Sequence, residues 1–218
     1  KRFWQDNTRL IALAVPMIIA NVTTPLLGLV DTAVLGHMQS TAMLAGASVG
    51  ALIITQIYWV CGFLRMSSTG LSAQAKGQQN AKLASAKVLW QTALVAVLLG
   101  LMLWALQMPV LHAGIALSNP AEDVQGHLTA YFNVRVWGAP AAMLNLALIG
   151  WLVGQQKTRT VLAIQVVGNL LNAGLDMLFV YGFDLSVSGV ALASVMAEYT
   201  MAILALIVAM KLPLGITP

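Results

Sequence analysis

Residues 10–38 read LIALAVPMIIANVTTPLLGLVDTAVLGHM, and this stretch decides the fold class. The run is apolar and long enough to cross about 30 Å of hydrocarbon as a helix. It nevertheless contains Pro16 and Pro25, and it carries Asp31 near its far end. A proline removes a backbone hydrogen bond that lipid cannot replace, and a buried carboxylate costs about 2.5–3.5 kcal/mol on insertion scales. The stretch predicts a membrane helix that bends and carries a protonatable group. The alternative is that the prolines serve packing and Asp31 lies just outside the hydrocarbon.

The composition of the whole chain agrees with a membrane protein. Of its 218 residues 59% are hydrophobic and 8% are charged, whereas a soluble domain carries about 25% charged residues. The net charge of +4 does not indicate a nucleic-acid partner, because the basic residues sit in loops that alternate along the chain. The single cysteine, Cys61, excludes an internal disulfide and is typical of a small packing residue.

Six hydrophobic segments predict an all-α integral membrane protein, a bundle of six transmembrane helices. None of them shows the alternation of apolar and polar residues that is typical of a β-strand, so helices rather than a barrel are expected. The predicted spans are residues 10–35, 42–66, 83–108, 124–152, 160–182 and 187–211.

The basic residues predict the orientation of these spans. Ten of the 11 Lys and Arg residues lie at the chain start, in residues 65–87, in residues 157–159 or at Lys211, and Arg135 is the exception. The opposite loops, near His37, at 109–123 and at 183–186, hold no Lys or Arg. Both termini are therefore expected on the cytoplasmic side. The polar stretch 67–80, SSTGLSAQAKGQQN, is expected to be a solvated linker or an amphipathic connector between two spans.

Polar residues inside the predicted spans indicate a buried site. Span 160–182 contains VVGNLLNAGLDMLFV, whose spacing of three and four places its two Asn residues and its Asp on one helix face. Polar and acidic residues of the other spans lie at a similar depth, which predicts one polar pocket toward the extracellular side. Its candidate members are Asp31, Asn145, Asn169, Asn172, Asp176 and Glu198.

Such a pocket has chemistry suited to a small cation. Burial disfavours the charged form of a carboxylate, and a second carboxylate nearby disfavours it further, so the cluster is expected to take up and release protons. Carboxylate and carboxamide oxygens also suit Na⁺, with Asp31, Asp176 and Asn172 as its candidate ligands. The alternative is a structural network in which Arg135 neutralises one acid and the Asn residues join helices.

Three stretches together resemble the MATE (multidrug and toxic compound extrusion) exporters, and most of all their DinF-like branch. They are PMIIANVTTPLLGLVDTAVLGH, RMSSTGLSAQAKGQQN, and GNLLNAGLDMLFVYG followed by SGVALASVMAEY. The resemblance extends along the whole chain. It implies a twelve-helix fold of two six-helix lobes, of which residues 1–218 are the N-terminal lobe. The C-terminal lobe of the same polypeptide would then be a partner absent from this chain.

The resemblance also implies a function. MATE exporters expel amphipathic, often cationic, drug-like compounds from bacteria across the inner membrane, in exchange for inward H⁺ or Na⁺. The resemblance assigns the coupling carboxylates to Asp31 and Asp176, and supporting amides to Asn172 and Asn145. Pro16 and Pro25 match positions where the first helix bends when the acid is protonated. Glu198 is carried over as a neighbour of the pocket.

Two other classes of protein fit six spans with buried acids. An intramembrane aspartyl protease also uses two membrane aspartates, but its second one usually ends a GxGD pattern, whereas this chain has AGLD ending at Asp176. No HExxH motif supports a metalloprotease. A scaffold or receptor bundle leaves the buried acids unexplained. We therefore expect a transporter that is not an enzyme and uses no cofactor other than its coupling ion.

Overall fold

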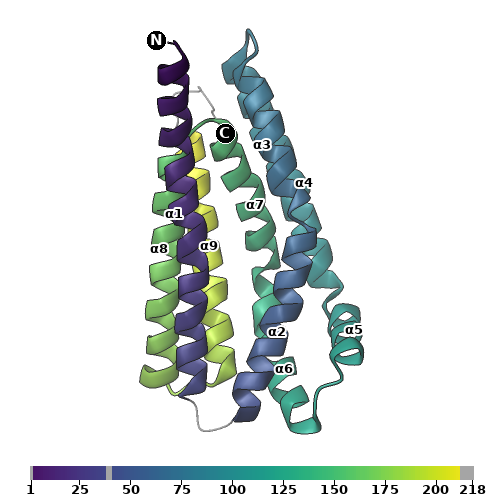
Figure 1. Ribbon diagram of the computed structural model, residues 1–218. Helices are drawn as coiled ribbons and strands as arrows, with labels where there is room; N and C mark the ends of the chain where they lie inside the picture. Colours follow the sequence, from purple (N-terminus) through teal and green to yellow (C-terminus); the bar gives the residue numbers. More distant parts are fainter. Residues whose placement is uncertain (1, 38–40, 212–218) are drawn as a thin grey trace.

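The computed structural model describes residues 2–37 and 41–211, with the side chains of residues 23–30 left out of the description. Within these ranges the chain is an elongated bundle of helices and contains no strand (Figure 1). The start of the first helix and the end of the last lie at the same end of the bundle. In chain order the elements are α1 (Arg2–Gly36), α2 (Thr41–Val60), α3 (Phe63–Lys76), α4 (Ala81–Ala105), α5 (Gln107–Ser118), α6 (Glu122–Arg135), a 3₁₀ turn (Val136–Gly138), α7 (Ala139–Gly154), α8 (Thr158–Met177), a π-helical turn (Leu178–Gly182) and α9 (Val187–Lys211).

Five stretches of the described chain are long and apolar enough to cross a membrane. They comprise α2 with α3, α4 alone, α6 with α7, α8 with the π-helical turn, and α9. The span predicted at residues 10–35 falls within α1, which is one α-helix through both prolines. The side chain of Pro25 lies outside the described residues, whereas Pro16 is buried.

The polar stretch after residue 66 is not a linker, because residues 67–76 belong to helix α3. Its hydroxyl groups donate to carbonyl oxygens of α7: Ser68 to Ala147 at 2.6 Å and Ser72 to Trp151 at 2.7 Å. These bonds replace water as the partner of the polar side chains, so the stretch packs against another helix inside the bundle.

Two further segments differ from their expected bounds. Arg65, near the end of the predicted span 42–66, lies in α3 well inside the apolar stretch Thr41–Lys76. Helices α2 and α3 follow each other with only residues 61–62 between them, so the span extends ten residues farther than predicted. The loop expected at 109–123 is mostly helical, because α5 occupies residues 107–118.

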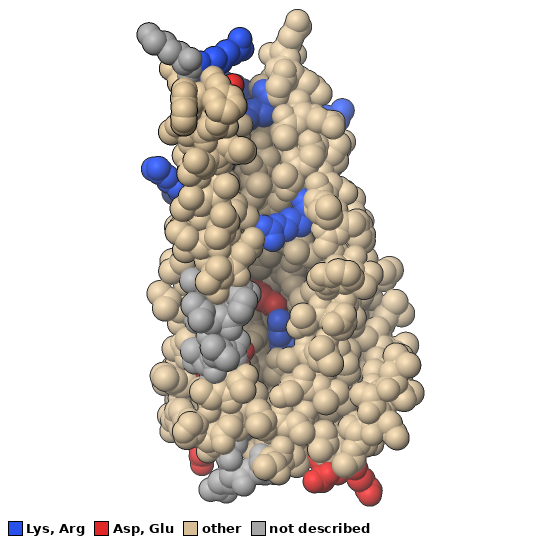
Figure 2. Space-filling view, viewed as in Figure 1, with Lys and Arg blue, Asp and Glu red and all other residues tan. Residues whose placement is uncertain are grey.

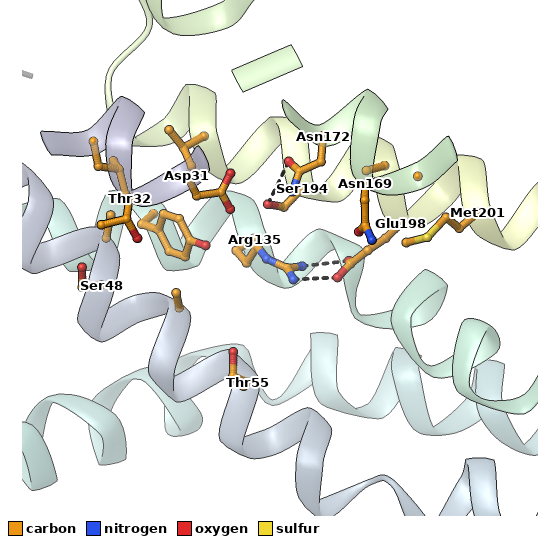
Figure 3. A pocket seen from close by; sticks show the side chains of 17 residues that line it. Asp31, Thr32, Ser48, Thr55, Arg135, Asn169, Asn172, Ser194, Glu198 and Met201 are labelled. Carbon is orange, nitrogen blue, oxygen red and sulfur yellow. Dashed lines mark hydrogen bonds and ion pairs between the residues drawn. The ribbon is translucent and has the colours of Figure 1, made fainter. Parts of the chain in front are cut away.

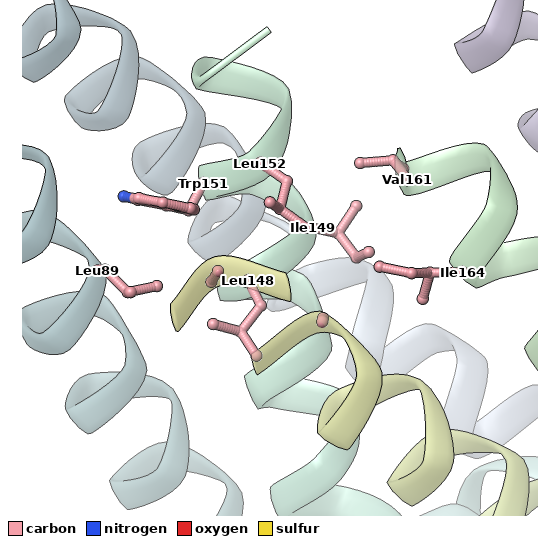
Figure 4. Packing of buried hydrophobic residues seen from close by; sticks show 9 residues of the cluster. Leu89, Leu148, Ile149, Trp151, Leu152, Val161 and Ile164 are labelled. Atoms are coloured by element: carbon pink, nitrogen blue, oxygen red, sulfur yellow. The ribbon is translucent and has the colours of Figure 1, made fainter. Parts of the chain in front are cut away.

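Helix α7 is the centre of the bundle and packs against α3, α4, α8 and α9. Its residues Leu148, Trp151 and Leu152 are fully buried (Figure 4). They meet Leu89 from α4 and Val161 from α8 in one apolar cluster. The indole nitrogen of Trp151 donates to the carbonyl oxygen of Ser85 at 2.9 Å, so this buried polar group has a partner.

Small residues hold α2 close to α6. A Cβ atom at Gly46 would lie 2.5 Å from the Cβ atom of His127, and one at Gly50 would lie 2.6 Å from Cδ1 of Tyr131. Glycine at both positions lets the two helix backbones approach. This close packing places Tyr131, and Arg135 one turn later, beside the interior of the bundle.

Candidate functional site

A cavity of about 510 Å³ lies between α1, α2, α6, α8 and α9. The space-filling view shows a hollow in one face of the molecule, with acidic and basic side chains inside it (Figure 2). The close view shows polar side chains from these five helices around the cavity (Figure 3). Its charged and amide-bearing lining residues are Asp31, Arg135, Asn169, Asn172 and Glu198.

Two carboxyl groups from different helices meet at one side of this cavity. Asp31 on α1 lines the cavity and interacts with the Asp176 carboxyl group and with the Asn172 amide. Asp176 on α8 is fully buried and does not line the cavity. Among the described residues, Oδ1 of Asp31 and both carboxyl oxygens of Asp176 have no hydrogen-bond donor. Two neighbouring acids without a donor require a proton or a cation, because unscreened like charges repel at low dielectric.

The predicted amides occupy different places. The Oδ1 atom of Asn172 accepts a long hydrogen bond of 3.5 Å from the hydroxyl of Ser194, and Asn169 reaches the cavity with its Nδ2 atom unpartnered among the described residues. Asn145 on α7 does not line the cavity and donates from Nδ2 to the backbone carbonyl of Glu198 at 2.9 Å. Asn145 therefore joins α7 to α9, whereas Asn169 and Asn172 face the cavity.

Arg135 and Glu198 form a two-pronged ion pair in the wall of the cavity. Nη1 of Arg135 donates to Oε2 of Glu198 at 2.8 Å, and Nη2 lies 2.6 Å from Oε1 (Figure 3). The guanidinium also lies over the ring of Tyr58, 5.5 Å from its centroid. The structure thus confirms that Arg135 neutralises one acid, and it identifies that acid as Glu198.

A close glycine shapes this ion pair. A Cβ atom at Gly138 would lie 2.3 Å from Oε2 of Glu198 and 3.2 Å from Nη1 of Arg135. The hydroxyl of Tyr199 fixes the neighbouring turn by donating to the carbonyl oxygen of Trp137 at 2.8 Å. The 3₁₀ turn between α6 and α7 therefore presents a residue without a side chain to the carboxylate of Glu198.

Sequence reasoning missed several lining residues. Ser48 and Thr55 on α2, and Tyr131 on α6, line the cavity without having been singled out. Tyr131 stands four residues before Arg135, and this spacing places both on one helix face. The two residues on α2 carry no such signal, because isolated hydroxyls in an apolar helix commonly bond to their own backbone.

The oxygen atoms at the carboxyl pair fit a hard cation better than a soft transition metal. No group of three His, Cys, Asp or Glu residues gathers anywhere in ranges 2–37 and 41–211. The donors beside Asp31 are one carboxylate and one amide, which are oxygen ligands of the kind that hard cations prefer.

Known proteins resemble this chain over most of its length. A family model described as MatE matches residues 16–178. The chain is 42% identical over 200 residues to DNA damage-inducible protein F of Escherichia coli (strain K12), covering 92% of this chain and 43% of that relative. It is 32% identical over 176 residues to the probable multidrug resistance protein NorM of Shewanella oneidensis, covering 80% and 37%.

The fold is also that of solved structures. A crystal structure of MATE in complex with MaD3S matches with a TM-score of 0.81 at 20% identity, covering 94% of this chain and 45% of that chain. The chain spans less than half the length of these relatives. The family match, which extends from α1 through the carboxyl pair to the end of α8, shows that this chain belongs to the MatE family.

Proposed function

We propose that this chain is the N-terminal lobe of an exporter that expels amphipathic or cationic compounds in exchange for H⁺ or Na⁺. The relative from Shewanella oneidensis is named a probable multidrug resistance protein, and the matched crystal structure is of MATE. The observation that carries the proposal is the pair of Asp31 and Asp176. These two acids meet beside a cavity large enough for a small molecule, and three of their four oxygens have no donor in the described chain.

In the proton-coupled form of this mechanism, one proton bound by the pair supplies the missing donor. The proton removes one of two neighbouring negative charges and bridges the two carboxyl groups, which favours their approach. Loss of the proton restores repulsion between α1 and α8. In the Na⁺-coupled form, Asp31, Asp176 and Asn172 hold the ion with oxygen atoms.

Helix α1 is the element that transmits this change. It carries Asp31 near one end, and Pro16 and Pro25 interrupt its backbone hydrogen bonds. A bend at either proline would move the wall of the cavity, and the cavity would shrink and release its content, as in alternating access. Asn145 and the Arg135–Glu198 pair hold α6, α7 and α9 together as the fixed part of the lobe.

The charges of the lining favour a cationic substrate. Asp31 and Glu198 bring two acids to the cavity and Arg135 brings one base. The apolar lining, which includes Leu35, Val190 and Met201, suits the hydrophobic part of an amphipathic compound. The basic end of the bundle, where α1 begins, would face the cytoplasm of a bacterial inner membrane, with both termini of the lobe on that side.

The test uses the full-length transporter in proteoliposomes loaded with a fluorescent cationic drug, under an imposed pH or Na⁺ gradient. The substitutions Asp31→Asn and Asp176→Asn keep the size of the side chains and remove their exchangeable charge. Gradient-driven drug movement should be lost in both variants. The matched control is Glu122→Gln, which neutralises an exposed acid at the start of α6 and should transport normally.

Each result of this transport assay has a different meaning. Movement that follows the pH gradient identifies H⁺ as the coupling ion, and movement that requires Na⁺ keeps the site and changes the ion. Normal drug movement in Asp31→Asn and Asp176→Asn at matched protein levels would refute the proposed coupling site. Cleavage of a transmembrane peptide by the purified protein would instead support the protease alternative.

A further inference from the structure

A cluster of three basic residues lies at the end of the bundle where α1 begins, far from the acidic cavity. Nη2 of Arg9 donates to Oε1 of Gln156 at 2.7 Å. Nζ of Lys76 donates to the carbonyl oxygen of Gln155 at 3.0 Å and to Oε1 of Gln156 at 3.4 Å. The charges of Lys157 and Arg9 both act on Lys76. Arg9 from α1 and Lys76 from α3 thus meet at the amide oxygen of Gln156, which lies next to Lys157 in the turn between α7 and α8.

These three cations have no acidic partner in the described part of the chain, where the ion pair is that of Arg135 with Glu198. Neutral oxygens accept the hydrogen bonds of Arg9 and Lys76. No carboxylate of the described residues lies at ion-pair distance to offset the repulsion between the like charges. Gln156 holds the cluster together from a left-handed backbone conformation, with φ of 64°. An anion bound at this point would receive hydrogen bonds from groups that already converge.

An apolar groove begins at the same residue. A groove of about 330 Å³ runs between α1, α3 and the end of α7, and Gln156 lines it together with Leu10, Leu13, Ala14, Met17 and Val153. Gly154 sets how closely α7 approaches α3, since a Cβ atom there would lie 2.5 Å from the carbonyl oxygen of Thr69. The groove therefore continues the cation cluster with a wall suited to a hydrocarbon chain.

The depth of the cluster matches the surface of a bilayer. Phe3 and Trp4 lie one to two turns before Arg9 on α1, and they expose 70% and 73% of their surface. Exposed aromatic residues at the end of a membrane helix are typical of the headgroup level. Arg9, Lys76 and Lys157 are then placed where lipid phosphates lie.

We propose that this cluster and groove bind one anionic phospholipid, with the phosphate on Arg9, Lys76 and Lys157 and one acyl chain along the groove. A soluble phosphate would satisfy the cations and leave the apolar groove uncovered, whereas a lipid satisfies both. The bound lipid would tie the start of α1 to α3 and to the α7–α8 turn. This site is separate from the carboxyl pair and does not depend on the proposed transport function.

Native mass spectrometry of the full-length transporter, titrated with phosphatidylglycerol or phosphatidylcholine, tests the proposal. Each cation near a phosphate contributes about 1 kcal/mol, which corresponds to about 5-fold in affinity. The double variant Arg9→Gln with Lys76→Gln should therefore bind its tightest phosphatidylglycerol about 30-fold more weakly. Lys157→Gln alone should weaken it about 5-fold. The matched control is Lys82→Gln, an exposed lysine in the first turn of α4, which should bind as the unmodified protein does.

A second pair of variants tests the groove without changing charge. Ala14→Phe fills the groove and should weaken phosphatidylglycerol binding, while Ala12→Phe on the exposed face of the same helix should not. Equal binding in the double variant and in Lys82→Gln would overturn the proposal, as would equal affinity for phosphatidylglycerol and phosphatidylcholine. Displacement of the lipid by millimolar inorganic phosphate, with no effect of Ala14→Phe, would identify a soluble-anion site instead.

Discussion

Removing one partner of the Arg135–Glu198 ion pair should lower the free energy of unfolding by an unusually large amount. We predict that Arg135→Gln and Glu198→Gln each destabilise the protein strongly, and that the double variant costs no more than either one. The reason is that each single variant leaves a charge in the cavity wall without its partner. Arg135 left alone would also be drawn to Asp31, on which its charge already acts.

The expected size follows from the geometry. Two charges about 4 Å apart attract by about 4 kcal/mol at an effective dielectric constant of 20. Removing one partner of a buried pair costs about 3–5 kcal/mol. Both side chains retain 13% exposure, so the lower end of that range, about 3 kcal/mol, is expected for each single variant. If the double variant also costs about 3 kcal/mol, the coupling energy is about 3 kcal/mol, the upper end of measured values.

The assay is reversible unfolding of the full-length protein in mixed micelles with increasing denaturing detergent, followed by tryptophan fluorescence. The four proteins of the double-mutant cycle are measured under the same conditions. A coupling energy below about 0.5 kcal/mol, that is, additive single effects, would refute the reasoning. It would mean that water screens the pair and that the contacts at 2.6 and 2.8 Å contribute little.

Two other substitutions probe close contacts by the same unfolding assay. Gly138→Ala should cost about 1.5–3 kcal/mol, because its Cβ atom would lie 2.3 Å from Oε2 of Glu198 and displace a charged hydrogen bond. Gly126→Ala in α6, with nothing within 4 Å, should not destabilise the protein. Equal effects of the two substitutions would contradict the close packing of Gly138 against the ion pair. Ser68→Ala should cost about 1 kcal/mol through the lost bond to Ala147, whereas exposed Ser67→Ala should be neutral.

The sequence was sufficient for the class of the fold, because membrane-spanning helices depend on local composition. It was insufficient to place the stretch 67–76, because the same polar residues fit a solvated loop and a helix that forms hydrogen bonds with a neighbouring helix. Only the position of α7, with the carbonyl oxygens of Ala147 and Trp151 facing Ser68 and Ser72, distinguishes the two. The predicted span 42–66 was ended too early for the same reason, since the polar residues of α3 begin there.

The candidate site was predictable where residues share one helix and less so where helices must meet. The spacing of Asn169 and Asn172 placed both on one face of α8, and both line the cavity. Asn145 was grouped with them by its depth and by the family resemblance, and it bonds to the backbone of α9 instead. The partner of Arg135 depends on the angle between α6 and α9. The spacing of residues within a single helix does not predict that angle.

The buried acids of the described chain divide into two groups by whether a partner is present: Glu198 pairs with Arg135, whereas Asp176 has no hydrogen-bond partner. Gln155 is buried and donates to the hydroxyls of Ser72 and Ser85, so it belongs to the frame of the lobe. Asp176 is equally buried, yet both of its carboxyl oxygens lack a donor among the described residues. Burying an unpaired acid is costly, and a structural role would not require it. A cost of this kind is expected where a proton or a cation comes and goes, and the second acid, Asp31, stands beside it on the helix that two prolines weaken.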